Sequence, residues 1–310
     1  MAGSDPGPAP GTAAPGALFG PEETLVLDGG LSNQLADQGC DLSDALWSAR
    51  LLADAPEQIE AAHTAYVRAG ARVLITASYQ ATYEGFAHRG VGREETSVLL
   101  RGSVELARRA AGGRPGVRVA ASVGPYGAML ADGSEYRGRY GRTVRELERF
   151  HRPRIETLAA AAPDVLALET VPDSDEAEAM LRAVEGTGVP VWLSYTIDGE
   201  RTRAGQPIAD AFALAVGRED VIAVGVNCCA PADADHAVEV AAETTGKPVV
   251  VYPNSGEHWN AEARRWHGGS AFDPAQVTRW RASGARLIGG CCRVGPTEIA
   301  AIAAALHDGG

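Results

Sequence analysis

The sequence contains almost no lysine. Of its 28 lysine and arginine residues only Lys247 is a lysine, so an enzyme that forms a Schiff base would have to use that residue. No run of about 18 apolar residues occurs, which argues against a membrane-spanning helix. Residues 1–20 are rich in alanine, glycine and proline and lack the basic and apolar regions of a secretory signal. We therefore expect a cytoplasmic protein whose first 20 residues form a disordered tail.

Basic residues are also fewer than acidic ones. The 40 aspartates and glutamates give the 310-residue chain a net charge of −12, which argues against nucleic acid or an anionic membrane as the main partner. The same negative charge suits a small cationic substrate. With 45% hydrophobic and 22% charged residues the composition is that of a globular protein. We expect a monomer, because no arm for assembly is evident.

Eight short apolar runs divide the chain, and helical patterns lie between them. Parallel strands that are buried on both faces have this composition, with little alternation. Eight strands alternating with helices predict an α/β fold, a single (β/α)8 TIM barrel over residues 21–310. A doubly wound sheet is the alternative, but its GxGxxG fingerprint is missing after the first run. The runs are Leu25–Asp28, Arg72–Ala77, Val117–Val123, Val165–Thr170, Val189–Thr196, Val221–Cys228, Pro248–Asn254 and Ala285–Cys291.

Three helices between or after these runs have recognisable ends. Pro56 begins and Gly70 follows a helix over Pro56–Ala69, the usual placement of these two residues. Asp173 followed by Glu176 predicts a capping box that opens a helix over Ala177–Val184. An alanine-rich final helix is expected over Thr297–Leu306.

Reactive groups in such barrels gather where the strands end and the following loops begin. Lys247 precedes its strand and would lie at the opposite end, which argues against a Schiff-base aldolase. The expected mouth instead receives carboxylates and thiols from four strands. These residues are Asp28, Glu169, Cys228, Cys291 and Cys292.

The thiols are the most specific of these groups. Three thiolates can hold Zn²⁺ and leave one tetrahedral position open for a substrate atom. Side chains alternate across a strand, so only one of Cys228 and Cys229 should reach the mouth. Both Cys291 and Cys292 can do so only if the strand breaks, which the preceding Gly289-Gly290 permits. From spacing alone, a zinc site and cysteines buried as small apolar residues both remain open.

Two loops after the second and third strands carry glycine and tyrosine. The stretch from Gly124 to Gly138 has the composition of a lid over the mouth. Aromatic faces suit a cationic ligand, although each of these rings is equally suited to packing a loop onto the barrel. The rings are those of Trp47, Tyr79, Tyr83, Tyr126 and Tyr136.

Several of these segments resemble the homocysteine S-methyltransferases over about residues 22 to 305. The most specific are Asn227-Cys228 after the sixth strand and Gly289-Gly290-Cys291-Cys292 after the eighth. The other segments are Asp28-Gly29-Gly30-Leu31, Asp41-Leu42-Ser43-Asp44, Leu46-Trp47-Ser48, Thr76-Ala77-Ser78-Tyr79-Gln80-Ala81-Thr82, Gly124-Pro125-Tyr126-Gly127, Glu135-Tyr136-Arg137-Gly138 and Val251-Tyr252-Pro253-Asn254-Ser255-Gly256-Glu257.

The resemblance implies a zinc-dependent barrel that methylates the thiolate of L-homocysteine to give methionine. It implies that zinc activates the thiol without a further catalytic residue and that Cys229 is structural. The implied zinc ligands are Cys228, Cys291 and Cys292. The implied substrate-binding residues are Asp28, Gly29, Tyr79 and Glu169, of which Asp28 and Glu169 hold the ammonium group.

The methyl donor is expected to be a sulfonium compound. The Ser-Tyr-Gln and Asp-Gly-Ser-Glu-Tyr-Arg-Gly segments resemble the branch that uses S-methylmethionine, with S-adenosylmethionine as a lesser donor. Alternatives are a betaine-using or selenohomocysteine-using relative, a barrel enzyme that binds phosphate at Gly289-Gly290, and a thiol redox sensor at Cys291-Cys292.

Overall fold

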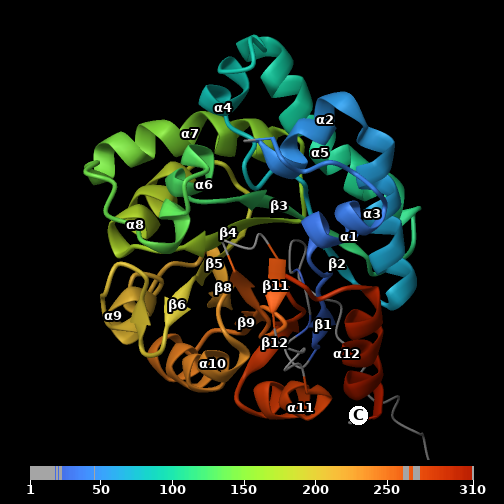
Figure 1. The fold of residues 1–310 in the computed structure, drawn as a ribbon. Coiled ribbons are helices and arrows are strands. Elements are labelled where there is room, and N and C mark those ends of the chain that lie inside the picture. The colour runs from blue at the N-terminus through green and yellow to red at the C-terminus, as the bar shows by residue number, and fades with distance from the viewer. Residues whose placement is uncertain are drawn as a thin grey trace, which may run out of the picture.

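A computed structural model describes residues 18, 20, 23–44, 46–260, 265–267 and 273–308. Eight parallel strands surround an axis, and helices surround the strands (Figure 1). In the sheet the order is β1-β12-β9-β8-β5-β4-β3-β2. The strands are β1 (Leu25–Val26), β2 (Val73–Ile75), β3 (Arg118–Val123), β4 (Val165–Val171), β5 (Val191–Tyr195), β8 (Val221–Asn227), β9 (Val249–Tyr252) and β12 (Ala285–Ile288).

The two ends of this sheet meet and close the barrel. A parallel bridge joins Leu27 to Val73. On either side of it Arg72 N–H donates to Val26 O over 2.7 Å, and Asp28 N–H donates to Val73 O over 3.0 Å. The predicted (β/α)8 barrel is therefore confirmed. Seven of the predicted runs contain one strand each, shorter than the run by one or more residues, and β4 extends one residue beyond its run to Val171.

Helices follow the strands and cover the outside of the barrel. Two short antiparallel pairs lie in the loops, β6 (Ile197–Asp198) with β7 (Arg201–Thr202) and β10 (His258–Asn260) with β11 (Arg265–His267). The helices are α1 (Leu31–Asp37), η1 (Trp47–Arg50), α2 (Leu51–Asp54), α3 (Pro56–Ala69), α4 (Tyr83–Ala87), α5 (Arg93–Ala111), α6 (Tyr126–Leu130), η2 (Ser134–Tyr136), α7 (Val144–Ala160), α8 (Ser174–Ala183), α9 (Ile208–Ala213), α10 (Pro231–Thr245), α11 (Pro274–Ala282) and α12 (Pro296–Asp308).

The predicted helix ends are correct for α3, and α12 extends beyond its predicted bounds. In the capping box predicted for α8, the role of Asp173 is confirmed and the role of Glu176 is wrong. Asp173 is the N-cap and its side chain accepts from the Asp175 N–H. The Glu176 carboxylate instead accepts from the Tyr126 N–H and contacts His151, because it is buried between α7 and α8. Tertiary packing thus redirected a side chain that local spacing assigned to the cap.

Alternation along the strands determines which side chains enter the barrel. An inner apolar cluster takes every second residue, such as Val165 and Ala167 on β4 and Val250 and Tyr252 on β9. The same alternation places Glu169 on the inner side at the carboxyl end of β4. A larger apolar cluster packs the outer faces of the strands against the helices.

Most of the predicted tail lies outside the described residues. Of residues 1–20, Leu18 and Gly20 are described, and Leu18 is buried in the inner cluster. Among all the residues that the structure describes, none of the helices is long and apolar enough to cross a membrane.

Candidate metal and substrate site

A cavity of about 130 Å³ opens at the carboxyl ends of the strands. Residues from six strand ends and from the loops after β1, β2 and β3 line it. Six of the seven predicted metal and substrate residues are among them, and the seventh, Asp28, is not. The lining residues are Gly29, Gly30, Leu31, Ser32, Asn33, Trp47, Ser48, Ile75, Thr76, Ala77, Tyr79, Gln80, Glu135, Tyr136, Glu169, Thr170, Cys228, Tyr252, Cys291 and Cys292.

Three cysteines form a cluster at one side of this cavity. The sulfur atoms of Cys228, Cys291 and Cys292 all lie within 4.8 Å of one another. Cys228 Sγ and Cys291 Sγ are in disulfide contact, and Cys292 Sγ lies 4.0 Å from Cys291 Sγ. A disulfide and a metal bound by the same two sulfurs exclude each other, so metal binding requires both cysteines to be reduced.

The strand break anticipated before Cys291 is present. β12 ends at Ile288, and Cys291 and Cys292 follow in a loop, so the alternation of strand side chains no longer separates them. The loop after β9 holds this segment in place. Pro253 O accepts from the Cys291 N–H over 2.7 Å, and Asn254 Oδ1 accepts from the Cys292 N–H over 3.1 Å.

Cys228 reaches the cavity through an unusual backbone conformation. Its φ is +50°, in the left-handed region that residues other than glycine seldom adopt. Cys229 is fully buried in the outer apolar cluster, and burial raises the pKa of its thiol to about 12. The expectation that one of these two cysteines reaches the mouth is therefore confirmed, and Cys229 has a packing role.

The three sulfurs fit a tetrahedral metal ion. Thiolates bound to zinc at about 2.3 Å stand about 3.8 Å apart, which small side-chain rotations would achieve here. Burial raises the pKa of the Cys292 thiol to about 11, and the Glu135 carboxylate adds to the shift. A bound cation would reverse this balance by stabilising the thiolate. Soft sulfur ligands favour zinc over magnesium or calcium.

Asp28 lies directly beneath the cavity rather than in its lining. It is 1% exposed, and Oδ2 accepts from the Ile75 N–H over 2.8 Å. Oδ1 accepts from the Tyr252 hydroxyl over 3.2 Å, and that hydroxyl also donates to Gly29 O over 2.8 Å. Burial nevertheless keeps the pKa of Asp28 well above its usual value.

The only histidine ring close to Asp28 among the described residues carries no charge to offset it. His63 Nδ1 lies 4.0 Å from Asp28 Oδ2, but burial lowers the pKa of His63 to about 4. Gly29, which lines the cavity next to Asp28, has no room for a side chain. A Cβ there would stand 2.4 Å from Val294 O and 2.5 Å from Tyr66 Cε1.

Glu169 points into the cavity from the end of β4. It is 6% exposed and accepts a hydrogen bond from the Ser122 hydroxyl on β3. Burial raises the pKa of Glu169 to about 7, and the Ser122 hydrogen bond opposes that shift. Among the described residues no arginine, lysine or histidine forms an ion pair with this carboxylate. A cationic ligand entering the cavity would therefore find an unpaired carboxylate.

Three of the five predicted aromatic rings line the cavity: Trp47, Tyr79 and Tyr136. The Tyr79 hydroxyl is hydrogen-bonded to Thr170, and burial raises its pKa. The other two rings belong to packing. Tyr83 bonds to Ser97 and Thr157 between helices, and Tyr126 stacks on Tyr140 and Phe150.

Two contributions to the site were not anticipated from the sequence. Asn227 Oδ1 accepts from the Thr170 N–H, and Asn227 Nδ2 donates to Thr170 Oγ1, both over 2.7 Å. This pair ties the residue before Cys228 to the residue after Glu169. Tyr252 is the other, through its bonds to Asp28 and Gly29. Their positions at the ends of β8 and β9 were the available signal.

Lys247 lies at the opposite end of the barrel, as expected. It precedes β9, and its Nζ donates to Arg218 O over 2.9 Å. A Schiff-base mechanism at the cavity is therefore excluded by position. Cys40 is half-buried against the outer apolar cluster, away from the sulfur cluster.

Known proteins share both this sequence and this fold. The family model described as homocysteine S-methyltransferase matches residues 25–306. The chain is 46% identical to homocysteine S-methyltransferase 4 of Zea mays, covering 91% of this chain and 89% of that protein. It is 45% identical to the homocysteine S-methyltransferase of Escherichia coli, covering 93% and 97%. The metallated crystal structure of the homocysteine methyltransferase MmuM from Escherichia coli superposes with a TM-score of 0.82 at 43% identity, covering 91% and 96%.

Proposed function

This chain belongs to the homocysteine S-methyltransferase family, and from that membership we propose that it transfers a methyl group from a sulfonium donor to zinc-bound L-homocysteine. The observation that carries the proposal is the cluster of three cysteine sulfurs within 4.8 Å beside a buried, unpaired Glu169. Sulfur ligands suit a thiol-activating metal, and a buried carboxylate suits an amino-acid ammonium group.

The metal site would be completed by the acceptor. Cys228, Cys291 and Cys292 would hold zinc and leave the fourth tetrahedral position open. Zinc bound there would supply deprotonation of the homocysteine thiol, whose ordinary pKa of about 8.5 leaves it mostly protonated at neutral pH. The chain therefore needs no general base at this step.

The acceptor's amino-acid end would be held by the buried carboxylates. Asp28 and Glu169 lie at the ends of β1 and β4, and burial without a charged basic partner raises the pKa of both carboxylates. A cation in the cavity would compensate their charge. The ammonium of homocysteine would pair with Glu169 and lower its pKa again, since an opposite charge favours the ionised form. Gly29 would contact the acceptor through its backbone, and Tyr79 would pack against it. These contacts orient the sulfur toward the donor.

The methyl transfer is a direct displacement. The new bond forms between the acceptor sulfur and the methyl carbon, while the bond from that carbon to the donor sulfur breaks. The electron pair of the broken bond stays on the donor sulfur, which becomes a neutral thioether. With S-methylmethionine as donor, one homocysteine and one donor give two methionines and one proton. Orientation by the protein accounts for several kcal/mol of barrier lowering in such reactions.

Methionine formation by zinc-loaded, reduced protein tests the proposal. Homocysteine is supplied with S-methylmethionine, S-adenosylmethionine or betaine in parallel reactions. We expect two methionines per homocysteine consumed with S-methylmethionine, slower turnover with S-adenosylmethionine and none with betaine. A chelator should abolish the activity, and added zinc should restore it. Turnover that persists at full rate without bound metal, or with betaine alone, would contradict the proposal.

A further inference from the structure

We propose that Glu135 binds the sulfonium group of the methyl donor and lowers the KM for that donor. The inference rests on the proposed function, which brings a sulfonium compound into this cavity. It assigns a donor role to a carboxylate distinct from those proposed for the acceptor, Asp28 and Glu169.

Glu135 is a buried carboxylate that forms no ion pair with any described residue. It lies in η2, is 7% exposed and lines the cavity. Its Oε2 atom is buried and accepts no hydrogen bond from any residue that the structure describes. Arg137, whose charge acts on Glu135, is 68% exposed and forms its ion pair with Asp132 over 3.6 Å instead. The charge of Glu135 is therefore available to a ligand in the cavity.

Counting charges assigns this carboxylate to the donor. Homocysteine carries one cationic group, its ammonium. The proposed function already provides two carboxylates for that group, at the ends of β1 and β4. Those two carboxylates accept hydrogen bonds from neighbouring protein groups, Asp28 from Ile75 and Glu169 from Ser122. Glu135 comes from a different element, the loop after β3. A second cation in the cavity would have to arrive with the donor.

The surroundings of Glu135 suit a sulfonium better than an ammonium. A sulfonium has no N–H to donate and is recognised by charge and by aromatic faces. Tyr136 and Tyr79 line the cavity beside Glu135. Cys292 of the sulfur cluster lines the same cavity. The donor sulfur must face the sulfur held at the cysteine cluster, so Glu135 lies on the side where the sulfonium arrives.

The loop holds this carboxylate in a defined place. A Cβ on Gly127 would stand 2.4 Å from the Glu135 nitrogen, so α6 and η2 pack backbone against backbone. Asp132 Oδ1 accepts from the Ser134 N–H over 3.0 Å and shapes the turn that precedes Glu135. Gln80 Nε2 donates to Ala128 O over 2.9 Å and ties the loop after β2 to α6. Preorganisation of this kind reduces the entropy lost on binding.

The role of Glu135 should appear in donor binding rather than in the chemical step. The positive charge on the donor sulfur disappears as the methyl group leaves, so the attraction is stronger in the bound donor than in the transition state. Such an interaction lowers KM without raising kcat. It also weakens as the thioether product forms, which favours product release.

Steady-state kinetics of the zinc-loaded wild type, Glu135→Gln and Glu178→Gln provide the first test. For Glu135→Gln we expect the KM for S-methylmethionine to rise about tenfold, because one charge contact with the donor is lost. The kcat should stay within about twofold of the wild-type value, and the KM for homocysteine should be unchanged. Glu178→Gln removes the same charge from the surface of α8, away from the cavity, and glutamine can keep the hydrogen bond from Arg182. We expect it to match the wild type in all three constants.

Binding of dimethylsulfoniopropionate provides a second test that needs no turnover. This probe carries a sulfonium but no ammonium, and calorimetry measures its affinity for the same three proteins. We expect Glu135→Gln to bind it at least about fivefold more weakly than the other two. Equal binding by all three proteins, or a rise in KM confined to homocysteine, would overturn the inference. Loss of probe binding in a protein that makes no methionine would support the sulfonium site and refute the proposed function.

Discussion

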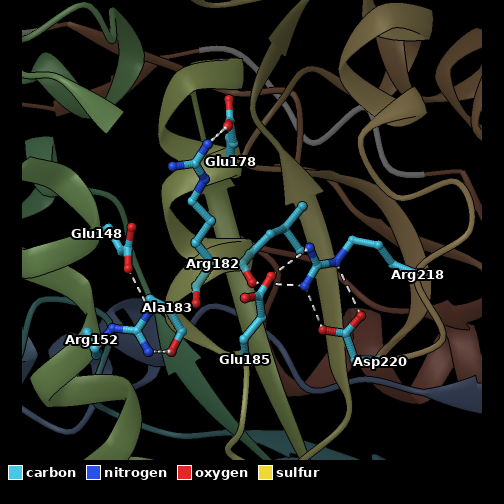
Figure 2. A network of polar contacts seen from close by, with 9 residues as sticks. Glu148, Arg152, Glu178, Arg182, Ala183, Glu185, Arg218 and Asp220 are labelled. Atoms are coloured by element: carbon cyan, nitrogen blue, oxygen red, sulfur yellow. Dashed lines mark hydrogen bonds and ion pairs between the residues drawn. The ribbon is translucent and has the colours of Figure 1, made fainter. Parts of the chain in front are cut away.

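The two ends of the barrel carry their charges in opposite ways. At the amino ends of the strands, acidic and basic side chains pair on the surface (Figure 2). Arg218 donates to both carboxylate oxygens of Asp220 over 2.9 and 3.2 Å and pairs with Glu185 over 3.3 Å. Arg152 pairs with Glu148 and Arg182 with Glu178, each one turn apart on its helix. All four acids of this network have basic partners.

At the carboxyl ends the carboxylates are buried and unpaired. Glu135 and Glu169 form no ion pair with any residue that the structure describes, and Asp28 has only the neutral His63 nearby. Burial raises the pKa of all three groups. Such groups cost stability unless a ligand compensates them. The difference teaches that exposed charges find partners on the surface at little cost, while buried carboxylates without an ion pair indicate a site for cations.

A third cluster is buried, but its polar groups have partners. It therefore shows the effect of burial separately from the effect of a missing partner. Arg154 Nη2 donates to His151 Nδ1 over 2.7 Å and to Gly124 O, and His151 Nε2 lies 2.8 Å from Glu176 Oε1. Arginine has no acceptor, so His151 Nδ1 carries no proton and its Nε2–H donates to Glu176. Burial and the Arg154 charge hold the pKa of His151 well below its usual value. Burial alone therefore does not identify a ligand site.

Removal of one sulfur ligand should have the largest effect. We expect Cys228→Ser to lose bound zinc and about a thousandfold or more of the methyltransferase activity, because two thiolates hold the metal poorly and orient the acceptor less well. Metal content and methionine formation measure this. Cys229→Ala removes the neighbouring buried thiol and should keep both. Full zinc and turnover in Cys228→Ser would refute the ligand assignment.

Breaking the buried, paired cluster should reduce stability next most strongly. Arg154→Met leaves His151 Nδ1 and Gly124 O without their donor, at a cost of about 3 to 5 kcal/mol in the free energy of unfolding. Urea denaturation measures it. Arg152→Met on the same helix removes a partly exposed arginine and should cost less than about 1 kcal/mol. Equal losses in the two variants would show that burial does not distinguish these arginines.

Neutralising Glu169 should weaken acceptor binding. We expect Glu169→Gln to raise the KM for homocysteine about 10- to 100-fold, because the variant loses one buried charge contact with the ammonium group. The KM for the donor should be unchanged. Because the pKa of Glu169 in the free enzyme is raised to about 7, the wild-type kcat/KM for homocysteine should fall about tenfold per unit below pH 7. The variant should lose this part of the pH profile. A donor KM that rises instead would reverse the assignment.

The same variant should be more stable than the wild type at high pH. The pKa of Glu169 is higher in the folded protein than its ordinary value, so the folded state binds the proton more tightly. Stability therefore falls as pH rises from about 4.5 through 7. We expect Glu169→Gln to unfold with a free energy about 1 to 3 kcal/mol higher at pH 8 and to gain nothing at pH 4. Denaturation at the two pH values measures this, and a destabilised variant at pH 8 would contradict it.

An exposed pair at the amino ends should contribute least. Arg182→Ala removes the contact with Glu178, whose carboxylate side chain is 41% exposed, and should change the free energy of unfolding by less than about 0.5 kcal/mol. Urea denaturation at low and high salt measures it. A loss above 2 kcal/mol would mean that the surface network is as important as the buried cluster.

Much of the fold was predictable because it depends on local patterns. Eight apolar runs without alternation identified eight strands that are buried on both faces, and Pro56 and Gly70 marked the ends of α3. The capping role of Glu176 was not predictable, because the partners that compete for its carboxylate, Tyr126 and His151, come from other elements.

For the cysteines and carboxylates of the site, too, some properties follow from the sequence and others only from the tertiary structure. By itself the sequence determined the barrel, its mouth and which reactive residue types follow its strands, because strand order and chain direction decide which ends meet. Only the tertiary structure decided that β12 stops before Cys291, that Cys228 rather than Cys229 turns inward, and that Glu135 is buried without an ion pair to any described residue. Those outcomes depend on packing and hydrogen bonding between segments far apart in the chain, which local residue patterns do not encode.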